Sequence, residues 1–263
     1  MVIKMYYIIQ YFTYGGFMNI VIFGATGGIG KCLSYELSKK HNLFLGSRYK
    51  NKIEKQVLDI SRSIKFKQSI NGSDVDVRHF TSIEKFINES NDFLGSIDVI
   101  INCTGSLLLK PPHLIDENDI EDIYKVNVFS CYGILKHSFK FLKNNGGSII
   151  FFSSAASSIG LKNHECISGA KAAISSIVSS ASSTYSRYNI RLNAIAPGLV
   201  ETPMTEKIVS SKIALDYSKK LHALNRIGTP QNFIPIINSL LDERSDWITG
   251  QTFIVDGGLS SVK

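Results

Sequence analysis

"GATGGIG" (Gly24–Gly30) places four glycines, among them Gly24, Gly28 and Gly30, directly after an apolar run at residues 19–23 and at the start of a helical pattern at residues 28–40. Glycines at the first, fifth and seventh positions permit a tight turn, a close approach of the backbone to a pyrophosphate, and close packing of helix against strand. The N-terminus of the helix then faces the phosphates. The stretch therefore predicts a dinucleotide-binding turn between a strand and a helix.

The same alternation of short apolar runs and longer amphipathic stretches, such as residues 81–93, continues along the chain. Runs that are apolar on both faces suit a parallel sheet covered by helices on both sides. These runs stand at residues 19–24, 42–47, 97–102, 147–154, 190–196 and 252–258. No repeat, linker or shift of composition divides the pattern. We therefore expect an α/β fold with a doubly wound parallel sheet, a Rossmann-like three-layer α/β/α sandwich, formed by residues 18–263 as one domain.

Residues 1–17 stand apart from this pattern. Lys4 followed by the apolar residues Met5–Phe12 resembles a signal peptide. However, Gln10 interrupts a run that is already too short to span a bilayer, and no small-residue cleavage site follows. We expect residues 1–17 to be a dispensable extension or a misassigned start.

Composition narrows the environment and the partners. Four scattered cysteines without a C-x-x-C pair favour a reducing compartment, so we expect a cytoplasmic protein. The formal net charge is +7, and the lysines are spread along the whole chain. This spread indicates a solvated lysine-rich surface, or a weak preference for phosphate-bearing ligands, and it argues against nucleic acid as a partner. Neither a membrane partner nor a metal site is expected.

The spacing G-x-x-x-G-x-G, the second apolar run and the later "NCTG" together resemble the short-chain dehydrogenase/reductase family, from about residue 19 to residue 258. In that family an acidic residue at the end of the second strand binds the ribose hydroxyls of NAD. Here Ser47 stands in the acid's place and Arg48 follows. A guanidinium can bind a 2′-phosphate through two hydrogen bonds, so the resemblance implies NADP(H) as the cofactor. The alternative is that Arg48 merely opens a lysine-rich loop.

The resemblance also assigns the other cofactor contacts. They are Gly24, Thr26, Gly28, Ile29 and Gly30 in the first turn, Asp76 and Val77 beside the adenine, Asn102 and Gly105 in "NCTG", Lys171, and Pro197, Gly198, Val200 and Thr202, which would hold the nicotinamide carboxamide. Asp74 offers a rival register for the adenine pair. Cys103 is expected to be a small packing residue rather than a reactive thiol.

Four catalytic residues are typical of the family: an Asn, a Ser, a Tyr and a Lys. By resemblance, "KVNVFS" supplies Asn127, "FFSSAAS" supplies Ser154 and "SGAKAA" supplies Lys171. The tyrosine is expected thirteen residues after Ser154 and four before Lys171, and both intervals lead to Ile167. Isoleucine has no proton to donate, and a lost general acid costs about 10²- to 10⁴-fold in rate. The sequence therefore predicts an atypical active site.

His164 is a candidate for the missing donor. In the enoyl-thioester reductases, a divergent branch of the same superfamily, the tyrosine stands seven residues before the lysine, and His164 stands seven before Lys171. His164 and Ile167 are three residues apart, hence neighbours on one helix face. An imidazolium is a competent acid near neutral pH, although Lys171 and an oxidised nicotinamide would oppose its charge. Alternatively, His164 caps the helix or packs at its start.

Other donors on the same helix are weaker. Tyr185 lies fourteen residues after Lys171, which corresponds to about 21 Å along a helix. Tyr185 and Tyr188 are therefore set aside as local donors. Glu165 and Cys166 are expected to point elsewhere around the helix.

Three functions remain open. The first is an NADP(H)-dependent oxidoreductase that reduces a carbonyl, resembling the 3-oxoacyl-carrier-protein reductases, with a proton from His164 or from a water ordered by Asn127, Ser154 and Lys171. The second is an NADP(H)-binding pseudoenzyme or regulatory subunit, which the missing tyrosine favours and the three retained residues disfavour. The third is an enoyl-thioester reductase that uses His164.

The segment at residues 204–228 occupies the position of the family's substrate-covering lid. Its Ile208, Leu215 and Leu221 suggest an apolar small-molecule substrate, although ordinary amphipathic packing gives the same pattern. The resemblance also implies a homo-oligomer, a tetramer or a dimer, formed through the helices that carry Asn127 and Lys171.

Overall fold

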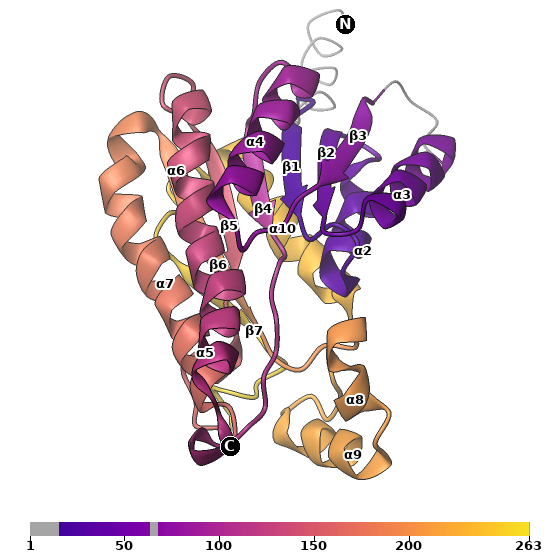
Figure 1. The fold of residues 1–263 in the computed structure, drawn as a ribbon, viewed down its shortest axis with the longest axis vertical. Helices are drawn as coiled ribbons and strands as arrows, with labels where there is room; N and C mark the ends of the chain where they lie inside the picture. The colour runs from indigo at the N-terminus through magenta and orange to yellow at the C-terminus, as the bar shows by residue number, and fades with distance from the viewer. Residues whose placement is uncertain (1–15, 64–67, 263) are drawn as a thin grey trace, which may run out of the picture.

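The computed structural model describes residues 16–63 and 68–262, so residues 1–15 of the predicted extension lie outside the described range. Seven parallel strands form one sheet with the order β3-β2-β1-β4-β5-β6-β7 (Figure 1). The strands are β1 (Asn19–Phe23), β2 (Asn42–Ser47), β3 (Ile70–Asp74), β4 (Val99–Asn102), β5 (Gly147–Phe152), β6 (Ile190–Pro197) and β7 (Thr252–Val255). The helices are α2 (Gly28–Leu37), α3 (Lys50–Ser63), α4 (Phe80–Leu94), α5 (Glu117–Tyr124), α6 (Ser130–Leu142), α7 (Glu165–Tyr185), α8 (Glu206–Val209), α9 (Lys212–Leu221) and α10 (Ile234–Leu241).

The strand order changes direction between β1 and β4. From β1 the chain proceeds to β2 and β3 on one side, and then returns to place β4 on the other side of β1. In doubly wound sheets the carboxyl ends of the strands open into a crevice at this point, where ligands bind. The predicted α/β fold with one parallel sheet is confirmed, and its ligand-binding edge follows from the topology.

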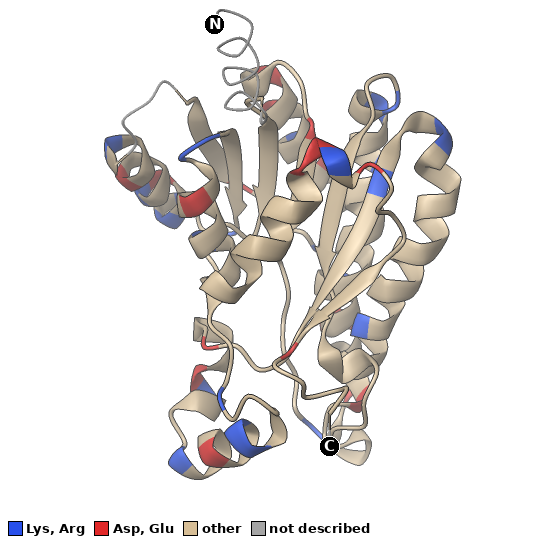
Figure 2. Ribbon diagram, turned by 180° about the vertical axis from the view of Figure 1, so that it is seen from behind, with Lys and Arg blue, Asp and Glu red and all other residues tan. Residues whose placement is uncertain are grey.

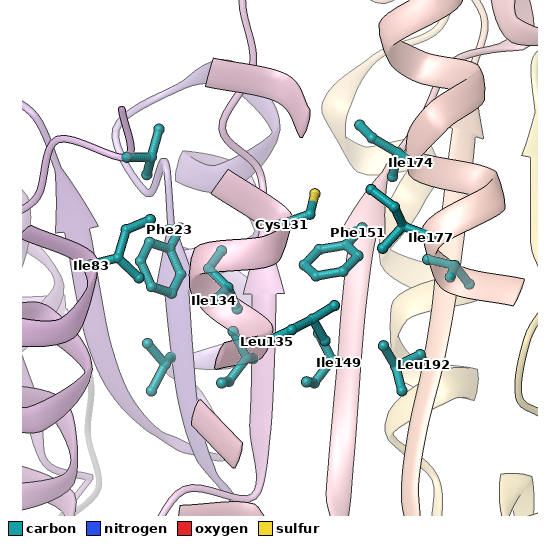
Figure 3. Close-up of a cluster of buried hydrophobic side chains, with 14 of the residues drawn as sticks. Phe23, Ile83, Cys131, Ile134, Leu135, Ile149, Phe151, Ile174, Ile177 and Leu192 are labelled. Carbon is teal, nitrogen blue, oxygen red and sulfur yellow. The ribbon is translucent and has the colours of Figure 1, made fainter. Parts of the chain in front are cut away.

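Helices cover both faces of the sheet, and β1 shows why. Val21 and Phe23 belong to one buried cluster, with side chains of α4, α6 and α7, while Ile20 and Ile22 belong to a second, with side chains of α2, α3 and α10. Alternate residues of a strand point to opposite faces, so an uninterrupted apolar run feeds both layers. Figure 3 shows part of the first cluster, including Ile134, Phe151, Ile174 and Leu192.

One strand lies outside the predicted set. The sequence of β3 is "INGSD", which is too polar to be recognised as an apolar run. It pairs only with β2 and forms an edge of the sheet, where its residues are half-buried or exposed. An edge strand with little buried surface needs few hydrophobic side chains, and this is why the pattern of apolar runs missed it.

Most Lys, Arg, Asp and Glu residues lie on helices and loops rather than on the strands (Figure 2). The two short helices α8 and α9, which fall in the predicted lid segment, carry charges of both signs and lie apart from the main body of the sheet (Figures 1 and 2). None of the helices within the described residues is long and apolar enough to cross a membrane.

Candidate active site

Close contacts leave no room for a Cβ at three glycines of the turn between β1 and α2. Gly24 has a φ angle of +72°, and a Cβ there would lie 2.8 Å from the carbonyl carbon of Cys103. A Cβ on Gly30 would collide with the carbonyl oxygen of Gly24, and a Cβ on Gly28 would lie 2.5 Å from Cγ2 of Thr202. At each of these three positions, steric contacts therefore favour glycine over any residue with a Cβ. The turn also leaves the N-terminal end of α2 beside a cavity, which Gly28 helps to line.

Two cations and a small side chain meet at the end of β2. Ser47 is buried, and its hydroxyl lies 2.6 Å from the hydroxyl of Thr26, which links the end of β2 to the glycine turn. Arg48 is exposed, with its guanidinium 5.6 Å from the centre of the Tyr49 ring, and the ammonium of Lys52 lies 4.8 Å from the same ring. This corner offers the positive charge that a phosphate requires, and no carboxylate stands in the place of Ser47.

The adenine candidates lie beyond β3, at the same edge of the sheet. Asp74 ends β3 and is the register partner of Ser47. The carboxylate of Asp76 forms an ion pair of 2.5 Å with Arg78, and hydrogen bonding to Arg78 holds the pKa of Asp76 below its ordinary value. Val77 is 4% exposed, so its side chain belongs to the core.

The turn after β4 is stabilised by Asn102. Its side-chain oxygen accepts hydrogen bonds from the backbone N–H of Thr104 (3.1 Å) and from the Thr104 hydroxyl (2.5 Å). Cys103 is half-buried and lines the cavity, and burial raises the pKa of its thiol, which keeps the thiol protonated and supports a packing role. A Cβ on Gly105 would lie 3.3 Å from Oδ1 of Asn127 and 3.5 Å from Nζ of Lys171. This glycine thus marks where two catalytic candidates converge.

Asn127 lies in a wide π-helical turn, Lys125–Phe129, that joins α5 to α6. Its side-chain amide donates to the carbonyl of Ile123 (2.9 Å) and to the hydroxyl of Ser106 (3.0 Å). The residue is 1% exposed, and its Oδ1 has no hydrogen-bond partner among the described residues. A buried carbonyl oxygen without a partner is a good acceptor for an ordered water or a ligand.

Two consecutive serines at the end of β5 have different roles. The hydroxyl of Ser153 donates to the carbonyl of Lys171 (2.8 Å) and contacts the hydroxyl of Ser175, so it holds α7 against the sheet. Ser154 is half-buried and lines the cavity, where its hydroxyl oxygen accepts only a 3.2 Å hydrogen bond from the backbone N–H of Ala156. Its O–H therefore remains available to a ligand, which supports Ser154 as the predicted residue.

Lys171 and Ile167 occupy successive turns of α7, and both line the cavity. The ammonium of Lys171 donates to the carbonyl of Phe152 (2.9 Å), and burial lowers the pKa of Lys171 to about 8. Ile167 is 3% exposed and belongs to the hydrophobic core as well as to the cavity wall. The face of α7 next to Lys171 thus carries an apolar side chain one turn before the lysine.

His164 precedes α7 and lines the same cavity. Its side chain makes no capping hydrogen bond to the helix. Instead Nδ1 lies 2.9 Å from the carbonyl of Lys162 and donates to it, which leaves Nε2 as the ring nitrogen available to a ligand. Tyr185 and Tyr188, which the sequence set aside, pack against Phe139 at the far end of α7.

The cavity has a volume of about 650 Å³ and lies between the carboxyl edge of the sheet and the predicted lid. Its lining includes every predicted position of the nicotinamide loop, namely Pro197, Gly198, Val200 and Thr202, and also Ile29 from the first turn. The lid contributes Ile208 and Leu221, as predicted, whereas Leu215 does not line the cavity. The prediction for Leu215 was wrong because a short amphipathic helix turns some of its apolar residues away from the cavity.

Sequence reasoning also missed residues of the lid. Tyr217 and Ser218 on α9 and His222 directly after it line the cavity. No signal in the sequence distinguishes them, because polar and aromatic residues at these positions fit an ordinary amphipathic helix equally well. Among the described residues that line the cavity there is no Asp or Glu, and the lysines are Lys162 and Lys171. The arrangement therefore suits a cofactor with negative charge and a largely apolar substrate.

Comparisons with known proteins agree with this geometry. A family model described as enoyl-(acyl carrier protein) reductase matches residues 24–260. A chloroplastic tropinone reductase homologue of Arabidopsis thaliana is 28% identical over 246 residues, which cover 92% of this chain and 76% of that protein. The 3-oxoacyl-[acyl-carrier-protein] reductase FabG of Chlamydia pneumoniae is 29% identical over 194 residues, 71% of this chain and 75% of that protein. The solved structure of ElxO with NADP bound has a TM-score of 0.85 at 26% identity, and the match covers 93% of this chain and 99% of ElxO.

The matched region contains the glycine turn, the strands β2–β7 and all the candidate catalytic residues. A match to a family model over most of the chain, together with a sheet of the same topology, goes beyond a shared motif. The chain therefore belongs to the short-chain dehydrogenase/reductase family of oxidoreductases.

Proposed function

We propose that this chain is an NADP(H)-dependent oxidoreductase that reduces a carbonyl group of an apolar, 3-oxoacyl-like substrate, and that its proton donor is not the tyrosine typical of the family. One observation carries the proposal. Ser154 and Lys171 line a single cavity together with the glycine turn and the Pro197–Thr202 loop, and the free oxygen of Asn127 lies next to that cavity at Gly105.

The residues present fit NADP(H). When bound, NADPH would supply a hydride. Gly24 brings the backbone of the first turn close to the backbone at Cys103, and Gly30 lets the start of α2 pack against Gly24, so no side chains stand in between, as a pyrophosphate site requires. Arg48 and Lys52 would hold the 2′-phosphate at the end of β2. The NADP in the structure of ElxO supports this choice of cofactor.

Three side chains would act on the carbonyl. The hydroxyl of Ser154 would donate a hydrogen bond to the carbonyl oxygen, since no acceptor holds its proton. The ammonium of Lys171 would bind the cofactor ribose and stabilise negative charge in its surroundings. Because its pKa is about 8, Lys171 can also return a proton to an ordered water near neutral pH. Such a water would be held by Oδ1 of Asn127.

We propose His164 as the proton donor, with the water near Lys171 as the alternative route. The hydrogen bond from Nδ1 to the carbonyl of Lys162 fixes the ring and persists when the ring is protonated, because Nδ1 is the donor in both states. The imidazolium would then donate from Nε2. Ile167 lies one turn along the helix and would exclude bulk water from the transfer.

NADPH oxidation with a panel of ketones and acyl thioesters tests the function. The wild-type protein is expected to turn over at least one of these substrates. His164→Gln keeps a polar hydrogen-bonding side chain at this place, but its amide cannot act as an acid, so kcat is expected to fall by about 10²-fold while the Kd for NADPH stays unchanged. His113→Gln, at an exposed position outside the cavity, is the matched control. An unchanged kcat in His164→Gln would mean that the ordered water near Lys171, and not His164, donates the proton.

Two other functions have specific support. The buried Ile167 favours an NADP(H)-binding pseudoenzyme or regulatory subunit, in which case NADPH binds but no substrate is reduced. The His164 spacing and the description of the family model favour enoyl-thioester reduction, in which case enoyl thioesters are consumed and ketones are not. In all three cases we propose a homo-oligomer formed through the helices that carry Asn127 and Lys171, because Phe129 in the π-helical turn and Tyr132 on α6 are 46% and 51% exposed.

A further inference from the structure

His222 lies where the lid meets the sheet, and its ring is 3% exposed. Its Nε2 accepts a hydrogen bond from the backbone N–H of Leu199 (3.2 Å), and its Nδ1 donates to the carbonyl of Ser218 (2.7 Å). Since a backbone N–H can only donate, Nε2 must carry a lone pair. The two bonds therefore fix the neutral ring with its single proton on Nδ1.

The two partners of the ring belong to opposite walls of the cavity. Leu199 lies in the Pro197–Thr202 loop on the cofactor side, and Ser218 lies on α9 of the lid. The backbone of Gly198 packs directly on the ring, because a Cβ there would lie 2.8 Å from Nε2. A single buried side chain thus connects the loop assigned to the nicotinamide with the helix that covers the substrate.

We propose that His222 is a positioning residue that couples the closure of the lid to the nicotinamide loop, and that a second proton on its ring breaks the coupling. The proposal rests on the proposed function. A proton on Nε2 would point an N–H at the N–H of Leu199, so the bond to the loop would be lost while the bond to Ser218 remained.

Charged groups lie on the elements that pack against the ring. Asp256, which follows β7, lies beside Gly198 and is the carboxylate that faces the ring; its oxygens already accept backbone N–H groups of Gly258 (2.9 Å) and Ser260 (2.8 Å). Lys219 and Lys220 lie in the last turn of α9, on the element that carries the ring. The loop at Gly198 and Leu199 contributes only backbone groups.

Two substitutions separate the bonds of the ring. In His222→Gln the amide oxygen can take the place of Nε2 and accept from Leu199, but it takes up no proton. In His222→Asn the shorter amide can replace Nδ1 toward Ser218 but does not reach Leu199. His113→Asn is the control at an exposed histidine.

The Kd for NADPH, followed by the fluorescence of the bound cofactor at pH 7.5 and 5.5, is the main readout. At pH 7.5, His222→Asn is expected to bind about tenfold more weakly than wild type, because a buried N–H loses its acceptor, and His222→Gln within about threefold. At pH 5.5 the wild type is expected to weaken toward the His222→Asn value, while His222→Gln keeps its affinity. Tryptic cleavage at the lid lysines of the cofactor-free protein at pH 7.5 is expected to accelerate only in His222→Asn.

Other outcomes overturn the proposal. If all variants bind NADPH as the wild type does at both pH values, His222 has no positioning role, while the proposed function stands. If His222→Gln and His222→Asn lose affinity and thermal stability equally, the ring is only a packing residue. A wild-type protein that binds neither NADPH nor NADH would overturn the proposed function and this coupling together.

Discussion

On the cofactor side of the cavity backbone atoms touch backbone atoms, whereas on the lid side exposed side chains face solvent. A Cβ on Gly24 would lie 2.8 Å from a backbone carbon of Cys103. On the lid, Ile213 is 85% exposed and Tyr217 is 65% exposed. Positions where a Cβ would collide with neighbouring backbone require glycine, and these glycines are visible in the sequence. An exposed surface accepts many kinds of side chain. The cofactor side is therefore constrained by shape, whereas the exposed surface of the lid is not.

A tyrosine in place of Ile167 is expected to have the largest effect. Ile167→Tyr places a hydroxyl one turn before Lys171, on the wall of the cavity, and kcat for carbonyl substrates is expected to rise by about 10²- to 10⁴-fold. Steady-state kinetics with NADPH and the ketone panel measure it. Ile174→Tyr, at a buried position on the same helix away from the cavity, is expected to lower stability without any gain. No gain in Ile167→Tyr would mean that the substrate side does not lack a proton donor.

Alanine substitutions in the glycine turn and on the lid would compare the two regions directly. Gly30→Ala forces a carbon against the carbonyl oxygen of Gly24 and is expected to lower the free energy of unfolding by about 3 kcal/mol. Ile213→Ala on the lid is expected to change it by less than about 0.5 kcal/mol. Chemical denaturation of both variants gives the two values. Equal losses would show that the lid is as tightly constrained as the turn.

Charge at the end of β2 should change the choice of cofactor without changing the fold. Ser47→Asp puts a carboxylate beside Arg48, where it would repel a 2′-phosphate and bind ribose hydroxyls instead. The ratio of the Kd values for NADH and NADPH is expected to fall by about 10- to 100-fold. Lys55→Gln, an exposed change on α3, serves as the control. A wild-type protein that binds NADH more tightly than NADPH would contradict the assignment of Arg48.

The smallest expected effect is the pH dependence of cofactor binding at Lys171. Its pKa of about 8 means that the ammonium is charged below pH 8 and neutral above it. The affinity for the negatively charged NADPH should therefore be highest near pH 7 and decrease by about three- to tenfold as the pH rises through 8 to 9.5. Lys171→Arg, which stays charged, is expected to show a flat profile over this range. A profile for the wild type that matches the arginine variant would mean that the bound lysine never loses its proton.

The sequence predicts those parts of the molecule in which burial or steric contact restricts the choice of residue at several neighbouring positions. Apolar runs predict six strands because each feeds both layers of the core, and the glycines predict the first turn because only they fit there. Ser154, Lys171 and His164, which the sequence singles out, all line the cavity. Their roles in catalysis remain predictions.

The remaining features depend on three-dimensional proximity. The strand β3 contains one large apolar residue, Ile70, because its edge position buries little surface. Leu215 and Tyr217 lie two residues apart on α9, yet only Tyr217 lines the cavity. The orientation of a short helix over a cavity depends on the loops at both ends. His222 acquires its partners from residues 4 and 23 positions away, which no local pattern connects.

The wide turn at Asn127 gives this residue a structural role that is independent of catalysis. Its side-chain amide donates to the carbonyl of Ile123, four residues earlier, within the stretch where α5 passes into α6. Removing that amide would take this donor from the carbonyl of Ile123 and destabilise the turn whether or not the protein performs any chemistry. Selection for folding alone is thus sufficient to keep an asparagine here, even in a descendant that had lost its reaction. Catalytic activity is consequently supported by Ser154 and Lys171 rather than by Asn127.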